Sequence, residues 1–497
     1  AGSGTYIENI DFLGKSITIE GSGPGATYII GDSTSTVTFN SGEDSLSILS
    51  NFTITRSDTM SSNINGGGIF CENSGPTLQN LEIKGNHGAE LGGGIYMYNS
   101  GAILNDVDII QNSANSEGGG LYVFFSEPTL NDVDVSDNTS ALNGGGLFIS
   151  SNSSAIMVNS LVSGNDAQEG GGIFATFGSN LISTDLTVFG NSAGQGAGIY
   201  LRSSESINNN LILSANSSTN GGAIYSYGSN MSVVGGLVYS NTGTNDGGGI
   251  YLTNNSTMNL ERIVLYNNTS SFGAAVYVDG SDIEITNVTI TENTSEIVST
   301  GTGGGIYCND NANVNLENTI VWNNAPDQMA FSPNNDPSSV TVLYSDIDGG
   351  TSNIVTNSNG SINWLSGNIN QNPMFLNTIS NNYNLQYGSP CIDTGDPDFD
   401  GDLLNLGPGD LDPDESQMDM GAFWFNRDDH IFGCTDPIGS NYDPTADFDD
   451  GCESEVSETC CEYESNYVLN FNGEGQYIAA PNLALHIYET VTFSVWV

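Results

Sequence analysis

The sequence predicts an all-β fold: a right-handed parallel β-helix, or solenoid, with about 26 residues in each coil. A glycine-rich pentapeptide, most often GGGIY, occurs ten times between Gly66 and Tyr307, at spacings of 25 to 30 residues. Each repeat contains short runs of aliphatic and β-branched residues and has no helical period. Because so short a unit has no room for a crossover helix, its parallel strands must be joined by simple coiling.

Two columns of the repeat identify residues expected inside the coil. The residue after the glycine triplet is always aliphatic, and the residue two places further on is mostly apolar, as in Ile95 and Met97. Side chains alternate along a strand, so both columns should face inward. An asparagine near the end of each unit should stack on its neighbours as an amide ladder. The ladder positions are Asn86, Asn112, Asn138, Asn165, Asn191, Asn216, Asn241, Asn267, Asn293 and Asn323.

The residue between these two columns is aromatic in all ten repeats. The column consists of Phe70, Tyr96, Tyr122, Phe148, Phe174, Tyr200, Tyr225, Tyr251, Tyr277 and Tyr307. Strict alternation places these rings outward as a ligand-binding stripe, which would suit sugar rings or a partner protein. A local bulge or a covering loop would hide them instead, and the sequence leaves both arrangements open.

The chain divides into five consecutive segments. Residues 1–65 are expected to form less regular coils or a cap, and residues 66–324 the regular array. Residues 325–432 contain a last coil and an acidic C-terminal cap, because an open β-helix end is a sheet edge that invites polymerisation. Residues 433–466 form a linker rich in cysteine and aspartate, and residues 467–497 begin a further β domain that needs more chain than this.

The charge of the chain bears on its partners. Only 6 residues are Lys or Arg and 58 are Asp or Glu, which gives a formal net charge of −52. Nucleic acid and anionic membrane surfaces are therefore unfavourable partners. We expect no membrane-spanning segment, since no apolar run is long enough. Divalent cations would relieve the self-repulsion of such a surface.

Closely spaced aspartates give the clearest local signal for a metal. The stretch DPDFDGD contains Asp396, Asp398, Asp400 and Asp402 and matches the start of a calcium loop, in which alternating carboxylates supply oxygen ligands. Gly407 stands where an EF-hand has its glutamate, so the full EF-hand pattern fails. The sequence therefore predicts a calcium loop without helices, with solvated turn acids as the alternative.

A second, weaker metal candidate includes Asp447 and Asp449. A disulfide between Cys434 and Cys452 could close this loop. Four of the seven cysteines crowd this loop-rich region, which favours an oxidising, extracytoplasmic setting.

A third acidic set is expected on one wall of the helix. It consists of Glu82, Asp106, Asp108, Asp132 and Asp134. Carboxylates about 5–7 Å apart could act as the acid and base of a glycosidase, bind a cation, or form a hydrated face. A polyuronate lyase would need a basic group, and the few Lys and Arg residues lie in different columns. We therefore assign no catalytic residue, and the sequence favours a protein that is not an enzyme.

The GGGIY and GGAIY units with their trailing asparagine resemble those of bacterial right-handed parallel β-helix surface proteins. These include polymorphic outer-membrane proteins and pectate-lyase-like repeat proteins, and the resemblance covers residues 1–425. Residues 433–452, GCTDPIGSNYDPTADFDDGC, resemble a cysteine-bounded spacer of secreted marine bacterial proteins. Residues 467–497 resemble the first strands of a laminin-G or concanavalin-like jelly roll. The resemblance implies a secreted bacterial protein, extracellular or at the cell surface.

Together these features predict a rigid, adhesin-like or structural stalk that contacts a polysaccharide or another surface protein and is stabilised by calcium. One alternative is a self-associating subunit of an extracellular filament. The other is a polysaccharide-degrading enzyme, with a glycosidase more consistent than a lyase.

Overall fold

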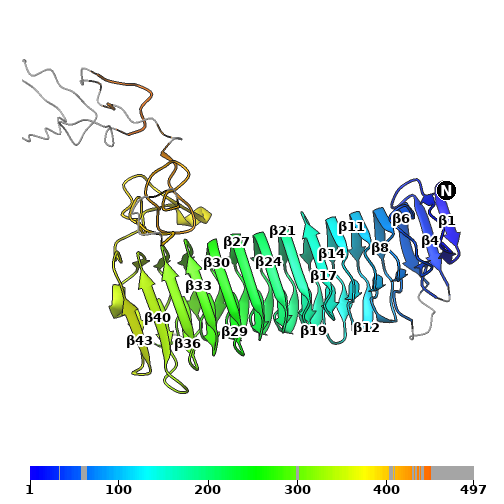
Figure 1. The fold of residues 1–497 in the computed structure, drawn as a ribbon, viewed down its shortest axis with the longest axis horizontal. Helices are drawn as coiled ribbons and strands as arrows, with labels where there is room; N and C mark the ends of the chain where they lie inside the picture. The colour runs from blue at the N-terminus through cyan, green and yellow to red at the C-terminus, as the bar shows by residue number, and fades with distance from the viewer. Residues whose placement is uncertain are drawn as a thin grey trace, which may run out of the picture. The chain divides into compact units, whose positions relative to one another are not determined.

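The computed structural model describes residues 1–32, 34–57, 64–297, 301–401, 407, 409–427, 430, 434, 435, 437 and 441–448. The chain forms two compact units, Ala1–Phe425 and Asn426–Val497. The first unit is a parallel β-solenoid (Figure 1), which confirms the predicted fold class. No helix within the described ranges is long and apolar enough to cross a membrane. The predicted jelly-roll start at 467–497 lies outside the described residues.

One wall of the solenoid is a 14-stranded parallel sheet that takes one strand from each coil. Its strands are β2 (Ile10–Asp11), β5 (Val37–Phe39), β7 (Ile69–Glu72), β10 (Ile95–Tyr98), β13 (Leu121–Phe124), β16 (Leu147–Ser150), β20 (Ile173–Thr176), β23 (Ile199–Arg202), β26 (Ile224–Tyr227), β29 (Ile250–Thr253), β32 (Val276–Asp279), β36 (Ile306–Asn309), β39 (Met329–Phe331) and β42 (Ile354–Val355).

The largest sheet has 20 strands, because some coils contribute two. They are β1 (Gly4–Ile7), β3 (Thr18–Glu20), β4 (Thr27–Gly31), β6 (Ile48–Arg56), β8 (Thr77–Lys84), β11 (Ile103–Ile110), β14 (Thr129–Ser136), β17 (Ser154–Val158), β18 (Leu161–Ser163), β21 (Asn180–Phe189), β24 (Glu205–Ser214), β27 (Asn230–Tyr239), β30 (Thr257–Tyr266), β33 (Asp282–Thr286), β34 (Thr289–Thr291), β37 (Asn313–Glu317), β38 (Ile320–Trp322), β40 (Ser338–Leu343), β41 (Asp346–Ile347) and β43 (Gly360–Trp364).

A nine-stranded parallel sheet of short strands completes the coils. It contains β9 (Ala89–Leu91), β12 (Ser113–Glu117), β15 (Thr139–Ser140), β19 (Asp166–Glu169), β22 (Ser192–Gln195), β25 (Ser217–Asn220), β28 (Thr242–Asp246), β31 (Thr269–Ser270) and β35 (Thr294–Ser295). The remaining elements are the antiparallel pair β44 (Phe375–Asn377) and β45 (Asn382–Leu385) and the 3-10 helices η1 (Gly350–Asn353) and η2 (Thr378–Ser380).

The coils stack in register, so each residue lies over its equivalent in the next coil. Ile95 lies between Ile69 and Leu121 in the 14-stranded sheet. Ile95 and Met97 are both fully buried and belong to one continuous apolar core. The two columns expected inside the coil are therefore confirmed.

The asparagine ladder is also present and is wholly internal. Asn112 donates from Nδ2 to Asn138 Oδ1 at 3.0 Å and to the Ile83 carbonyl oxygen at 2.9 Å. Its backbone N–H donates to the same Asn138 oxygen at 2.9 Å. The pattern repeats from coil to coil until Asn324, which donates to Gln328 Oε1 at 2.8 Å. A buried amide with these partners satisfies its hydrogen-bonding groups without water.

Two ladder positions differ from the sequence prediction. Asn268 and Asn324 occupy the ladder, whereas the predicted Asn267 and Asn323 come one residue earlier, with φ of 54° and 55°. The cause is a tight corner, because the residue before every ladder amide is left-handed. These corner residues are Gly85, Gln111, Asp137, Gly164, Gly190, Ala215, Ser240, Asn267, Glu292 and Asn323. Asparagine tolerates this conformation well, so an Asn–Asn pair fills the corner and then the ladder.

The glycine triplet forms a second left-handed corner. Its first residue has φ between 55° and 67° in all ten repeats. A Cβ on Gly92 would lie 2.3 Å from the Ile95 carbonyl oxygen, and one on Gly94 would lie 2.7 Å from the Gly120 carbonyl oxygen. Backbone conformation and close approach between coils therefore both require glycine here.

After the last coil, the closing segment runs back along the 20-stranded wall (Figure 1). The ring of Tyr383 lies 5.1 Å from that of Tyr266, and its hydroxyl donates to Glu292 at 2.8 Å. The Ala422 N–H donates to Thr289 Oγ1 at 3.0 Å. The acidic segment predicted within 325–432 therefore packs against the side of the solenoid, over β30 and β34.

Candidate functional site

The ten aromatic residues form one continuous stack on the outer face of the 14-stranded sheet. Neighbouring ring centroids are 4.7 to 5.5 Å apart from Phe70 to Tyr307. The rings lie outside the main core and form clusters of their own. The rings therefore point outward, as alternation along the strand predicts. They pack on one another as a second layer outside the main core, and most of them are buried there.

Seven of these rings are buried, and three are half-buried. The buried set is Tyr122, Phe148, Phe174, Tyr200, Tyr225, Tyr277 and Tyr307. The Cβ atoms of the aromatic residues lie close to the glycine corners. A Cβ added to Gly118, for example, would lie 2.9 Å from the Tyr122 Cβ. A bare outward stripe is therefore wrong for these seven, because their faces are occupied by neighbouring rings. Ligand binding at the half-buried Phe70, Tyr96 and Tyr251 stays a prediction.

Arg202 interrupts the regular stacking. Its guanidinium donates to the Tyr200 hydroxyl at 2.8 Å and to Glu169 at 3.1 Å. Its Cζ lies 5.2 Å from the centre of the Tyr200 ring and 5.6 Å from that of Phe174. The Tyr200 ring stands edge-on to both neighbours, at interplanar angles of 72° and 75°. This group is a structural bridge between coils, with cation–π and charge-assisted contacts.

The acids predicted on one wall separate into two columns. Glu82, Asp108 and Asp134 pair in register on adjacent strands. Asp106 and Asp132 instead occupy left-handed corners, with φ of 55° and 53°. Burial, followed by repulsion from Asp134, raises the pKa of Asp108, and burial raises the pKa of Asp134. Lys84 neutralises Glu82 at 2.6 Å. This ladder of like charges stays without a catalytic assignment.

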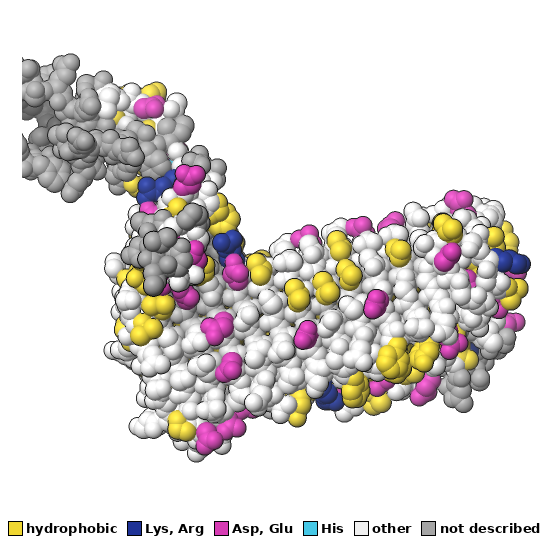
Figure 2. All heavy atoms as spheres, viewed as in Figure 1, with side chains coloured by type: hydrophobic (Ala, Val, Ile, Leu, Met, Phe, Trp, Pro, Cys, Tyr) yellow, Lys and Arg dark blue, Asp and Glu magenta, His cyan; other side chains and the backbone are white. Residues whose placement is uncertain are grey.

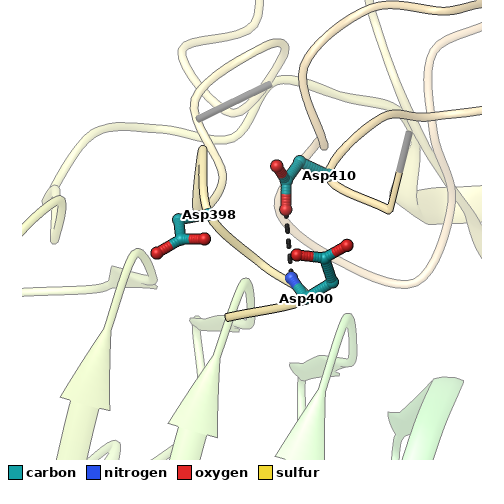
Figure 3. Close-up of side chains that lie close together, drawn as sticks. All are labelled: Asp398, Asp400 and Asp410. Carbon is teal, nitrogen blue, oxygen red and sulfur yellow. Dashed lines mark hydrogen bonds between the residues drawn. The ribbon is translucent and has the colours of Figure 1, made fainter. Parts of the chain in front are cut away.

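The closing segment brings three aspartates together as a candidate cation site (Figure 3). Carboxylate oxygens of Asp398, Asp400 and Asp410 all lie within 4.8 Å of one another. Asp410 is fully buried, and it accepts the N–H groups of Asp400 at 3.0 Å and Gly407 at 2.8 Å. These backbone donors hold its carboxylate in place. Three hard oxygen donors fit Ca²⁺, which prefers carboxylate and carbonyl ligands.

The predicted metal residues are only partly brought together. Asp398 and Asp400 join the cluster, and Asp396 instead accepts the Asp398 N–H at 3.0 Å. Burial and then the charge of Asp396 raise the pKa of Glu317 to about 7. Sequence reasoning missed Asp410, although it starts the acidic stretch DLDPDE just beyond the predicted loop.

The second metal candidate falls mostly outside the described residues. Asp449 and Cys452 lie there, as does Asp402 of the first candidate. Asp447 lies 3.8 Å from His430 Nδ1. Cys434 is disulfide-bonded, and its partner also lies outside the described residues.

A family model described as the Chlamydia polymorphic membrane protein (Chlamydia_PMP) repeat matches residues 287–309. The matched segment contains the ladder residue Asn293, the triplet starting at Gly303 and the stacked Tyr307. It confirms the resemblance to polymorphic outer-membrane proteins over that stretch. No curated protein matches the chain.

One similar solved structure is the crystal structure of pectate lyase Pel9A. It is 12% identical over 81% of this chain and 88% of that chain, with a TM-score of 0.32. A similarity of this size carries no argument about activity.

Proposed function

We propose that this chain is a module of a secreted or cell-surface protein, in which the solenoid is a rigid adhesin-like stalk that contacts glycans. The observation that carries the proposal is the pair of unbroken ladders. Buried amides and stacked rings both run through ten successive coils, so each coil is fixed to the next. A solenoid joined in this way resists bending and presents an extended surface.

The surface chemistry favours neutral glycans over anionic partners. Acidic side chains are scattered over the face of the solenoid in Figure 2, and few basic ones appear beside them. The net charge of −52 would repel uronic-acid polymers and sulfated glycans at moderate ionic strength. The match to a repeat of a membrane protein family supports a location at a surface.

Calcium at Asp398, Asp400 and Asp410 is part of the same proposal. Bound there, it would neutralise acids in the segment that packs along the wall and so fix that segment to the coils. The full chain on an array of neutral and acidic oligosaccharides, in CaCl₂ and in EDTA, tests the proposal. We expect retention on neutral glycans in calcium. Retention on no glycan in either buffer would contradict glycan contact.

A further inference from the structure

Two phenylalanines occupy a left-handed corner that holds asparagine or serine in the coils beside them. Asn73 and Asn99 stand there with φ of 49° and 47°, and Phe125 and Phe177 follow with φ of 48° and 53°. A left-handed backbone is unfavourable for a bulky side chain. Phe125 is also 49% exposed, so its ring is far from fully covered by the fold. Packing inside this chain therefore covers only about half of the Phe125 side chain.

Phe125 belongs to an aromatic cluster with the half-buried Tyr98 and Phe124. The rings of Tyr98 and Phe124 stack at 5.8 Å, and Phe125 meets them edge-on at 6.2 Å and 4.6 Å. The cluster continues into the buried column through Tyr122, whose ring lies 6.1 Å from Phe124. Hydrophobic side chains gather at the lower edge of the solenoid in Figure 2, near the position of β12 in Figure 1. The cluster is thus a firm platform supported by the ring stack.

Phe125 stands between two shallow hollows. The larger, of about 350 Å³, is lined by Asn73, Tyr98, Asn99, Phe125, Glu127 and Asn152. The smaller, of about 270 Å³, shares Asn99, Phe125 and Glu127. The larger hollow has the size of a small-ligand site, with aromatic walls and a few polar groups.

The polar groups of the larger hollow are available for hydrogen bonds. Asn99 donates to Asn73 Oδ1 at 2.8 Å, which fixes the orientation of both amides. The described residues give no hydrogen-bond partner to the side chains of Glu127 and Asn152. Amides and a carboxylate beside an aromatic face suit the hydroxyl groups and the apolar face of a sugar ring.

We infer that this cluster is a binding site for a neutral polysaccharide, whose pyranose rings stack on Phe125 and Tyr98. The hydroxyl groups would bond to Asn73, Glu127 and Asn152. The inference rests on the proposed function, and it names the ligand class and the place. No Lys or Arg lines either hollow, so an anionic sugar would find no counter-charge. One carboxylate is too few for a calcium site.

Phe177 provides a matched control within the chain. It occupies the same corner two coils further on and is 68% exposed. It lines neither hollow, and no ring contact involves it in the described structure. Phe125→Asn and Phe177→Asn should both fold, because asparagine holds the same left-handed corner at Asn73 and Asn99.

The test is affinity electrophoresis and calorimetry of the full chain with cellohexaose and mannohexaose, and with hexagalacturonate as the anionic control. We expect binding of at least one neutral hexasaccharide, weakened at least about tenfold by Phe125→Asn and by Tyr98→Ser. Phe177→Asn should bind like the unchanged chain, and hexagalacturonate should not bind.

Three results would overturn the inference. Equal binding by the Phe125→Asn variant would remove this site but leave glycan contact elsewhere intact, so the proposed function would survive. No binding of any neutral glycan by the unchanged chain would remove both. Dimerisation lost in Phe125→Asn, without glycan binding, would identify a second copy of the chain as the occupant.

Discussion

The coil array and the closing segment bury polar side chains in opposite ways. The array buries neutral asparagines that hydrogen-bond to one another, such as Asn165 with Asn191 at 3.0 Å. The closing segment and its contacts bury carboxylates, and Asp346, Asp410 and Asp419 are at most 2% exposed. A buried neutral amide needs only hydrogen bonds, whereas a buried carboxylate must also be neutralised or protonated. The asparagine ladder should therefore be insensitive to pH and cations, and the closing segment sensitive to both.

The largest effect is expected in the ladder. Asn268→Ala removes the acceptor of two Asn241 donors, each at 3.0 Å, and the donor to the Val238 carbonyl oxygen at 2.8 Å. Several buried groups lose their partners, so the free energy of unfolding should fall by about 4 kcal/mol. Denaturant titration should give the same loss of unfolding free energy at pH 5 and at pH 8.

Asn267→Gly is the control for this ladder prediction. Asn267 holds the left-handed corner, which glycine adopts freely, so its replacement should leave stability nearly unchanged. A large loss for Asn267→Gly and a small one for Asn268→Ala would contradict the ladder as assigned.

Calcium should have the next largest effect, confined to the closing segment. At a free concentration one hundred times its dissociation constant, it would stabilise that segment by about 2.7 kcal/mol. Hydrogen exchange should show slower opening at Tyr383 and unchanged exchange at Asn191. Asp410→Asn should abolish this difference, and Asp447→Asn should not. Unchanged exchange at Tyr383 in calcium would count against the site.

Protonation of Asp419 should have a smaller effect. Burial raises its pKa to about 8, although it accepts the N–H groups of Asp393 and Phe425. The folded state thus binds the proton more tightly than the unfolded chain, whose aspartates titrate near 4, so stability falls as pH rises from about 4 to about 8.

In EDTA the loss in the closing segment should be roughly 2–3 kcal/mol between pH 5 and pH 7. Asp419→Asn should make the profile shallower, as measured by hydrogen exchange of the closing segment. A slope remains because burial also raises the pKa of Glu317 to about 7 and that of Asp412 to about 6. Stability that increases over this range would show that Asp419 stays ionised when folded.

Sequence reasoning worked where the structure is set by alternation along a strand. The period and the inward columns at Ile95 and Met97 follow from local pattern alone. The ladder residue was predicted as Asn267 instead of Asn268, because either asparagine of the pair could occupy the left-handed corner. The exposure of Phe125 had a signal in the repeat itself, since it replaces the asparagine found at Asn73 and Asn99.

The cation cluster shows a different limit. Asp398 and Asp400 were predicted from their spacing, but Asp410 reaches them only through the fold of the intervening loop. The burial of the ring column likewise could not be predicted from alternation, because alternation says which side of the strand a ring occupies and not what covers that side.

The smallest effect is expected for Arg202, the charged side chain that contacts the rings of Tyr200 and Phe174. Arg202 bridges the Tyr200 hydroxyl and Glu169, and it is partly exposed, so its ion pair should contribute little. Arg202→Leu should lower the free energy of unfolding by about 1 kcal/mol or less, mostly from the cation–π contact. Denaturant titration at low and high salt measures this difference in unfolding free energy. The difference should shrink at high salt, because salt screens the ion pair that only the unchanged chain has. Without the guanidinium, the Tyr200 ring has no partner that favours its edge-on position, so near-ultraviolet circular dichroism should change towards regular stacking. A loss several times larger, equal at both salt concentrations, would instead mean that packing of the arginine stem holds these coils together.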